Sequence, residues 1–84
     1  MNRSERARLL ALDRCLQLLE DALLRGRQRV DARLASELKE LLGAAGLIPD
    51  HRLEGRRTER VLDDIFALQA KVMGTEEEMR AAEV

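Results

Sequence analysis

The chain has one histidine and one cysteine, the side chains best suited to acid–base or nucleophilic chemistry near neutral pH. His51 follows Asp50, and a carboxylate beside an imidazole can orient it for general base catalysis. The pair stands directly after Pro49, in a polar stretch with the composition of an exposed loop. A surface role fits that position better, so we predict no catalytic role for His51.

Cys15 lies next to Arg14, whose guanidinium can lower a thiol pKa if the two groups approach. It also lies next to Leu16 in an apolar pattern, which favours a buried or boundary position. A structural zinc site needs four ligands of the Cys or His type, and this chain has two such residues. We therefore predict no metal and no cofactor. A lone thiol fits a reducing compartment, so the predicted location is the cytoplasm.

Two pairs of carboxylates suggest a bridged metal: Glu37 with Glu40, and Asp63 with Asp64. Di-iron helical bundles combine inward-facing glutamates with Glu-x-x-His elements. No predicted helix of this chain contains a histidine, and these acids fall mostly on polar faces. We interpret them as solvated charges.

Arg25, Lys39, Asp50, Glu54 and Leu62 occur in an order that resembles the helical chorismate mutases. The resemblance covers less than half of the chain. The spacing between the arginine and the lysine departs from that family, and the sequence predicts no long final helix to complete such a pocket. We predict no enzyme.

The composition favours helices packed through aliphatic side chains. Hydrophobic residues make up 45% and charged residues 37% of 84 residues, and Phe66 is the only aromatic residue. A chain of this length forms one domain with a thin core, a situation that favours a partner. The β-branched residues are scattered, so no strand is predicted. No segment approaches the roughly 20 apolar residues of a membrane span, and we expect no membrane association.

The first predicted helix covers residues 4–25. Its leucines are spaced by alternating steps of three and four residues, the heptad pattern of coiled coils and helical bundles. They are Leu9, Leu12, Leu16, Leu19 and Leu23.

The second predicted helix covers residues 30–45 and ends at Gly46, followed by Pro49. The junction at Gly26 leaves two architectures open. If the chain turns there, the two helices form an antiparallel hairpin, which we favour. If it does not, residues 4–45 form one rod, because a single glycine costs a helix only about 1 kcal/mol.

A polar connector over residues 46–57 precedes a third amphipathic helix over residues 58–73, with Thr58 as its predicted cap. Gly74 is the predicted stop, and residues 75–84 form an acidic tail.

Charge is unevenly distributed, although the net charge is −1. Residues 1–30 hold seven arginines and four acids, whereas residues 61–84 hold two basic and six acidic residues. Arginines cluster at 25–33 and 52–60, and such guanidiniums suit phosphates. The candidates for anion or nucleic-acid contact are Arg25, Arg27, Arg29, Arg33, Arg56 and Arg57. The overall acidic balance and the absence of stacking aromatic residues argue against nucleic acid as the main ligand.

Together these patterns predict an all-α protein of one domain, residues 1–84, with a helical hairpin plus a third helix. Its excess leucine surface suggests a bundle completed by dimerisation. The predicted interface consists of Leu9, Leu12, Leu16, Leu19, Leu23, Leu62, Ile65 and Phe66. The predicted function is a non-catalytic interaction or oligomerisation module, an adaptor, regulator or assembly factor with an unidentified protein partner. The alternative is a small regulatory nucleic-acid-binding protein.

Overall fold

The structure, a computed structural model, describes residues 3–47 and 52–83. Within these ranges the chain forms three helices and no strand, as predicted. They are α1 (Arg3–Leu24), α2 (Ala32–Ala44) and α3 (Thr58–Glu83). Pro49, Asp50 and His51 lie outside the described residues. No helix in the described part of the chain is long and apolar enough to cross a membrane.

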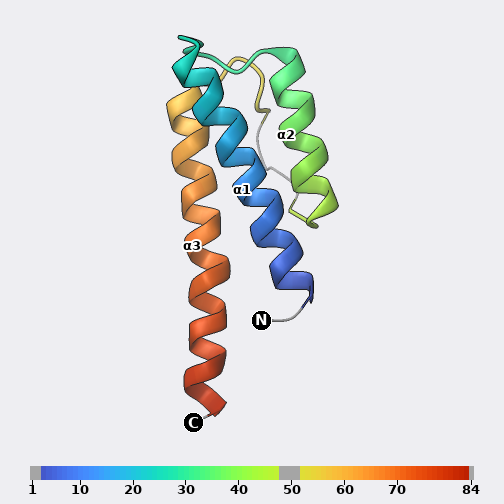
Figure 1. Ribbon diagram of the computed structural model, residues 1–84, viewed down its shortest axis with the longest axis vertical. Coiled ribbons are helices and arrows are strands. Elements are labelled where there is room, and N and C mark those ends of the chain that lie inside the picture. Colours follow the sequence, from blue (N-terminus) through green and yellow to red (C-terminus); the bar gives the residue numbers. More distant parts are fainter. Residues whose placement is uncertain (1–2, 48–51, 84) are drawn as a thin grey trace.

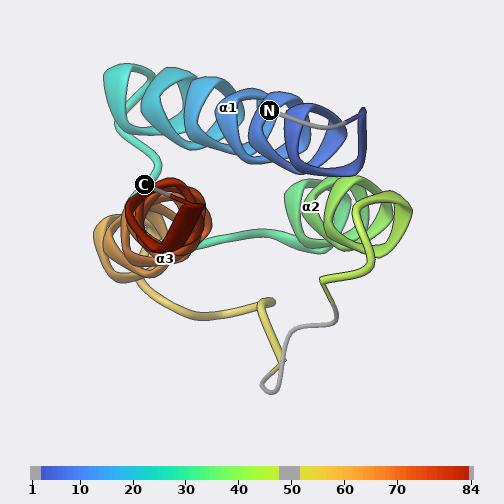
Figure 2. The same ribbon diagram turned by 90° about the horizontal axis from the view of Figure 1, so that it is seen from below.

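Helix α1 is central, because it contacts both α2 and α3, whereas α2 and α3 make no close backbone contact with each other. In Figure 1, α2 and α3 both start at the end of the molecule where α1 finishes, and both run back along it. Figure 2 shows them as two separate flanks on one side of α1. The chain is therefore not a single rod through Gly26.

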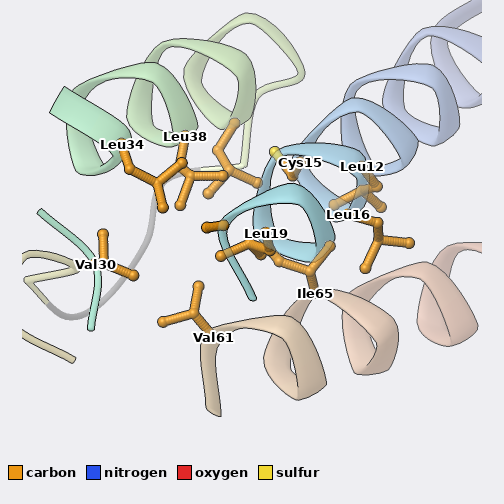
Figure 3. Close-up of a cluster of buried hydrophobic side chains, with 11 residues drawn as sticks. Leu12, Cys15, Leu16, Leu19, Val30, Leu34, Leu38, Val61 and Ile65 are labelled. Atoms are coloured by element: carbon orange, nitrogen blue, oxygen red, sulfur yellow. The ribbon is translucent and has the colours of Figure 1, made fainter. Parts of the chain in front are cut away.

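The core is enclosed within one chain. Leu12, Cys15, Leu19 and Leu38 are completely buried, and Val61 and Ile65 of α3 are almost so. In Figure 3 the side chains of α2 and α3 converge on the buried face of α1. Leu47 and Leu53, at the two described edges of the connector that follows α2, also pack against this cluster. Each leucine buried in this way stabilises the fold by about 1.5–3 kcal/mol relative to an exposed one.

Two glycines end α1 and α2 where the sequence predicts. Gly26 has a φ of 77°, and the N–H of Arg27 donates to the carbonyl of Ala22 at 2.9 Å. Gly46 has a φ of 73°, and the N–H of Leu47 donates to the carbonyl of Leu42 at 2.8 Å. Both ends are Schellman motifs, in which glycine adopts the left-handed conformation without the strain of a Cβ.

Helix α2 begins two residues later than predicted, because Asp31 caps it. The Asp31 carboxylate accepts a hydrogen bond from the Leu34 N–H at 2.8 Å. Val30, predicted to belong to the helix, precedes this cap and is 2% exposed in the core. The cap therefore fixes where the extended connector after α1 becomes helical.

The predicted end of the third helix at Gly74 is wrong. Helix α3 runs through Gly74 to Glu83, so residues 75–83 belong to it. Gly74 does not adopt the positive φ of a helix-ending glycine. A helix tolerates one interior glycine at a cost of about 1 kcal/mol, and the good helix formers that follow offset that cost.

Candidate interaction surfaces

The connectors on either side of α2 pair with each other at one end of the molecule. Arg29 and Arg57 form an isolated antiparallel bridge. The N–H of Val30 donates to the carbonyl of Arg56 at 2.9 Å, and the N–H of Gly55 donates to the carbonyl of Val30 at 2.8 Å. We call this end of the molecule, residues 25–33 with 52–60, the connector end. Its pairing fixes the start of α3 beside the end of α1.

Thr58 locks this pairing from the side of α3. It is completely buried, its N–H donates to the carbonyl of Gln28 at 2.9 Å, and its hydroxyl donates to the carbonyl of Arg27 at 3.0 Å. Thr58 was predicted as a cap of the third helix. Its side chain instead ties that helix to the first connector, a contact that joins residues 31 positions apart in the sequence.

The predicted arginine clusters meet at the connector end, but many of their guanidiniums are already engaged. Arg27 pairs with Asp31 at 2.8 Å, and Arg29 donates to the carbonyl of Gly55 at 2.8 Å. The remaining ion pairs of the clusters are Arg25 with Asp21, Arg33 with Glu37, Arg52 with Glu54, and Arg56 with Asp64. These contacts are exposed or half-exposed, so each contributes little to stability, about 0–1 kcal/mol.

Arg57 and Arg60 differ from the other arginines of this end. Within the part of the chain that the structure describes, neither has a carboxylate within 4.0 Å, and both are exposed. Arg29 also has no carboxylate partner among the residues that the structure describes; its guanidinium donates to a backbone carbonyl. These three guanidiniums keep the capacity to attract an anion in addition to their present contacts.

Two shallow hollows flank the connector end. The first, about 240 Å³, lies between α1 and α2 and has an apolar floor that includes Leu18, Ala22 and Leu34. Its rim consists of three arginines and three acids, which already pair with one another. The second, about 300 Å³, is lined by Leu23, Gln28, Arg57 and Glu59. Neither brings together an acid, a base and a nucleophile.

The predicted interface residues divide into two groups. Leu12, Leu16, Leu19 and Ile65 are at most 6% exposed in the single chain, so the heptad leucines of α1 serve its own core (Figure 3). The residues that remain accessible are Leu9, Leu23 and Leu62, which are half-buried, and Phe66.

The most accessible apolar surface with a regular pattern lies on α3. Phe66 is 45% and Met73 is 49% exposed. Together with half-buried Leu62 and Gln69 they follow helical steps of four, three and four residues, so they share one face of α3. We call this set the α3 stripe. Val61, Ile65, Leu68 and Val72, each one position earlier in the sequence, form the neighbouring face that packs towards the core.

Met73 was left out of the predicted interface, although a signal for it was present. The third helix has two adjacent apolar faces, one at positions 61, 65, 68 and 72 and one at positions 62, 66 and 73. Packing against a single neighbouring helix can bury only one of them. The exposed leucines of α1 do not form a comparable surface. Leu10 and Leu24 are 65% and 87% exposed, but Arg14, Gln17 and Asp21 separate them along that face.

In the described part of the chain, the side chains considered for nucleophilic or metal chemistry do not form a site. Cys15 is completely buried, and burial raises the pKa of its thiol from 9.0 to about 11, which opposes formation of the reactive thiolate. Among the described residues no three His, Cys, Asp or Glu side chains gather as a metal site would require.

The set that resembles chorismate mutases does not assemble in the described residues. Arg25 pairs with Asp21 at one end of α1, and Glu54 pairs with Arg52 in the second connector. Lys39 is exposed on α2, and Asp50 lies outside the described residues. The final helix is long, contrary to the prediction. Apart from Thr58, the side chains of its described part that are buried, Val61 and Ile65, are apolar.

Comparison with protein family models, with curated proteins and with solved structures found no match to this chain.

Proposed function

We propose that this protein is a small non-catalytic interaction module, an adaptor, regulator or assembly factor that contacts a protein partner through the α3 stripe. The observation that carries the proposal is the position of Phe66. It is the only aromatic residue of the chain, yet 45% of it remains exposed while leucines fill a thin core. Aromatic residues contribute much of the binding energy in protein interfaces.

The location we propose is a reducing compartment such as the cytoplasm. Cys15 is a free thiol buried in the core. A chain of this size from an oxidising compartment would usually be stabilised by disulfides, which a single cysteine cannot form within one molecule.

A photo-crosslinking amino acid tests the proposed surface. It replaces Phe66 in one variant and Leu10, an exposed apolar residue of α1, in a matched control, and both chains are irradiated in the cells that produce the protein. We expect a protein adduct from position 66 and none from position 10. The absence of a protein adduct at position 66 would contradict the proposal.

Nucleic-acid binding is the second candidate, and the pairing of the two connectors favours it. This pairing brings the clusters at 25–33 and 52–60 to one end of the molecule, where Arg57 and Arg60 have no carboxylate partner among the described residues. Against it, five of the eight arginines in those clusters pair with acids.

Fluorescence anisotropy with labelled DNA and RNA oligonucleotides at low salt tests this candidate. If it is right, Arg57→Glu with Arg60→Glu removes a salt-sensitive binding signal. Arg27 and Arg29 are poorer choices, because their side chains stabilise the connectors. An unchanged signal in the double variant, or no binding by the native chain, would refute it.

A further inference from the structure

The α3 stripe continues onto α1 near the connector end. The second hollow, about 300 Å³, is lined both by Leu23 near the end of α1 and by Glu59 in the first turn of α3. The two helices run in opposite directions (Figure 1), so this register puts position 20 of α1 level with Leu62 and position 16 level with Phe66. Leu23 and Leu62 are half-buried, and Phe66 is exposed. The apolar surface that a partner can reach therefore includes Leu23 as well as the α3 stripe.

Two carboxylates of α1 border this surface. Asp13, Leu16, Glu20 and Leu23 are spaced by three, four and three residues, so they lie on one face of α1. Figure 3 shows the Leu16 side chain directed from α1 towards α3. Leu16 is 6% exposed, whereas Asp13 and Glu20 are exposed. The two acids thus form the solvent-facing edge of the face that packs against α3.

Two carboxylates of α3 border the surface on its other side. Glu59 and Asp63 are exposed, and each lies three residues before an apolar residue of the α3 stripe. Arg60 and Lys71 lie on the opposite face of α3, roughly 150–170° around the helix from the middle of the stripe at about 100° per residue. These two cations therefore do not border the apolar surface.

The four bordering carboxylates lack a cation partner in the described part of the chain. No lysine or arginine nitrogen there lies within 4.0 Å of the carboxylate of Asp13, Glu20, Glu59 or Asp63. Asp13 accepts a hydrogen bond from the neutral amide of Gln17 at 3.3 Å. Acids elsewhere in the described chain do form ion pairs, namely Asp21, Asp31, Glu37, Glu54 and Asp64.

Arginines stand at the two ends of this surface. Arg57 lines the second hollow together with Glu59. Arg6 precedes Asp13 by seven residues, about two turns along the same face of α1. Between these ends the four carboxylates flank the accessible apolar side chains. A partner that covers the apolar side chains brings its own charges close to these carboxylates, which attract cations and repel acids.

We infer that the partner of the α3 stripe is a cationic amphipathic helix of another protein, with apolar residues on one face and Lys or Arg on both sides of that face. This inference rests on the proposed function. The apolar residues of such a helix would cover Leu23, Leu62 and Phe66, and its cations would reach the carboxylates of α1 and of α3. A second copy of this chain matches less well, because its own α3 stripe is also bordered by carboxylates.

A synthetic helical peptide provides the probe. It has about 18 residues, or five turns, with leucines on one face and lysines on both sides, and a second peptide carries glutamates in place of the lysines. Glu20→Gln with Glu59→Gln removes one carboxylate from each side of the surface. The matched control, Glu37→Gln with Glu40→Gln on α2, has the same net charge. Fluorescence anisotropy of the labelled peptides at low salt gives the Kd for each chain.

The native chain and the control should bind the lysine peptide with nearly the same Kd. The variant with Glu20→Gln and Glu59→Gln should bind it about three- to tenfold more weakly, because each exposed ion pair contributes little. The native chain should bind the glutamate peptide roughly tenfold more weakly or worse. No binding of the lysine peptide, equal Kd values for the two double variants, or equal Kd values for the two peptides would each overturn the inference.

The photo-crosslink at position 66 separates this inference from the proposed function. Mass spectrometry of the adduct identifies the segment of the captured protein, which should hold Lys or Arg beside apolar residues. A captured segment without such cations, or a second copy of this chain, would overturn the inference and leave the proposed function standing. The absence of any protein adduct would refute the proposed function itself.

Discussion

Gly74 distinguishes a continuous α3 from a helix that stops before its acidic end. In the structure it lies inside the helix without a positive φ, and a Cβ added there meets no atom within 4 Å. Replacing a glycine in a helix interior by alanine stabilises the helix by about 0.5–1 kcal/mol. Gly74→Ala should therefore strengthen the second half of α3.

Gly46→Ala is the matched control. Gly46 also has no atom within 4 Å of an added Cβ, but its φ of 73° belongs to the left-handed region. Alanine in that conformation costs about 1–2 kcal/mol. The two variants thus have the same substitution and opposite expected signs. For a domain of 60–100 residues, a change of 1 kcal/mol shifts Tm by about 4–8 °C.

The assay combines urea unfolding, followed by circular dichroism at 222 nm, with amide hydrogen exchange of α3. Gly74→Ala should raise helicity and slow exchange at the end of α3, while Gly46→Ala should lower the free energy of unfolding. If Gly74→Ala instead lowers helicity and stability as Gly46→Ala does, then Gly74 ends the helix and our description of α3 is wrong.

Variants at three further positions test the connector end and the core. Thr58→Val keeps the shape of the side chain but removes the hydrogen bond from the hydroxyl to the carbonyl of Arg27. It should therefore lower the free energy of unfolding in urea by about 1–2 kcal/mol and speed hydrogen exchange of the Val30 amide. Thr58→Ser keeps the hydroxyl and should keep that amide protected. Asp31→Ala should cost about 1 kcal/mol through the lost cap, and Asp31→Asn, which can still cap, should cost less. Burial raises the pKa of the Cys15 thiol from 9.0 to about 11, so the folded state keeps a proton that the unfolded state loses in this range. The free energy of unfolding should therefore fall as pH rises from 9.0 to about 11, by up to about 1.4 kcal/mol per pH unit. Cys15→Ala removes the thiol, so this contribution to the pH dependence should be absent in that variant.

The helices and two of their ends follow from local signals in the sequence. The leucine spacing predicts α1, and Gly26 and Gly46 predict where α1 and α2 end, because only glycine adopts a positive φ without strain. The same rule predicts a helix end at Gly74, and there it is wrong because α3 continues to Glu83. A glycine followed by good helix formers can remain helical, and the sequence does not show which outcome has the lower free energy.

The sequence does not show which apolar face packs against which, because that depends on contacts between residues far apart in the chain. The heptad leucines of α1 look alike whether they pack within one chain or between two, and in the structure Leu12, Leu16 and Leu19 are buried within one. The pairing of Arg29 with Arg57 joins two connectors through backbone hydrogen bonds, which leave no pattern of side chains in the sequence. In the structure Phe66 and Met73 are large apolar residues of α3 that remain exposed; the predicted interface includes Phe66 but not Met73.

The most direct test of the α3 stripe is the Kd of the lysine peptide, measured by fluorescence anisotropy at low salt. The samples are the native chain, Phe66→Ala and the matched control Leu10→Ala, which shortens an exposed apolar side chain of α1. We expect the native chain and the control to bind with the same Kd, and Phe66→Ala to bind roughly tenfold more weakly or worse with native helicity, because an aromatic residue contributes much of the binding energy of an interface. A native chain that does not bind, or a Phe66→Ala variant with the Kd of the native chain, would contradict binding of a cationic helix through the α3 stripe.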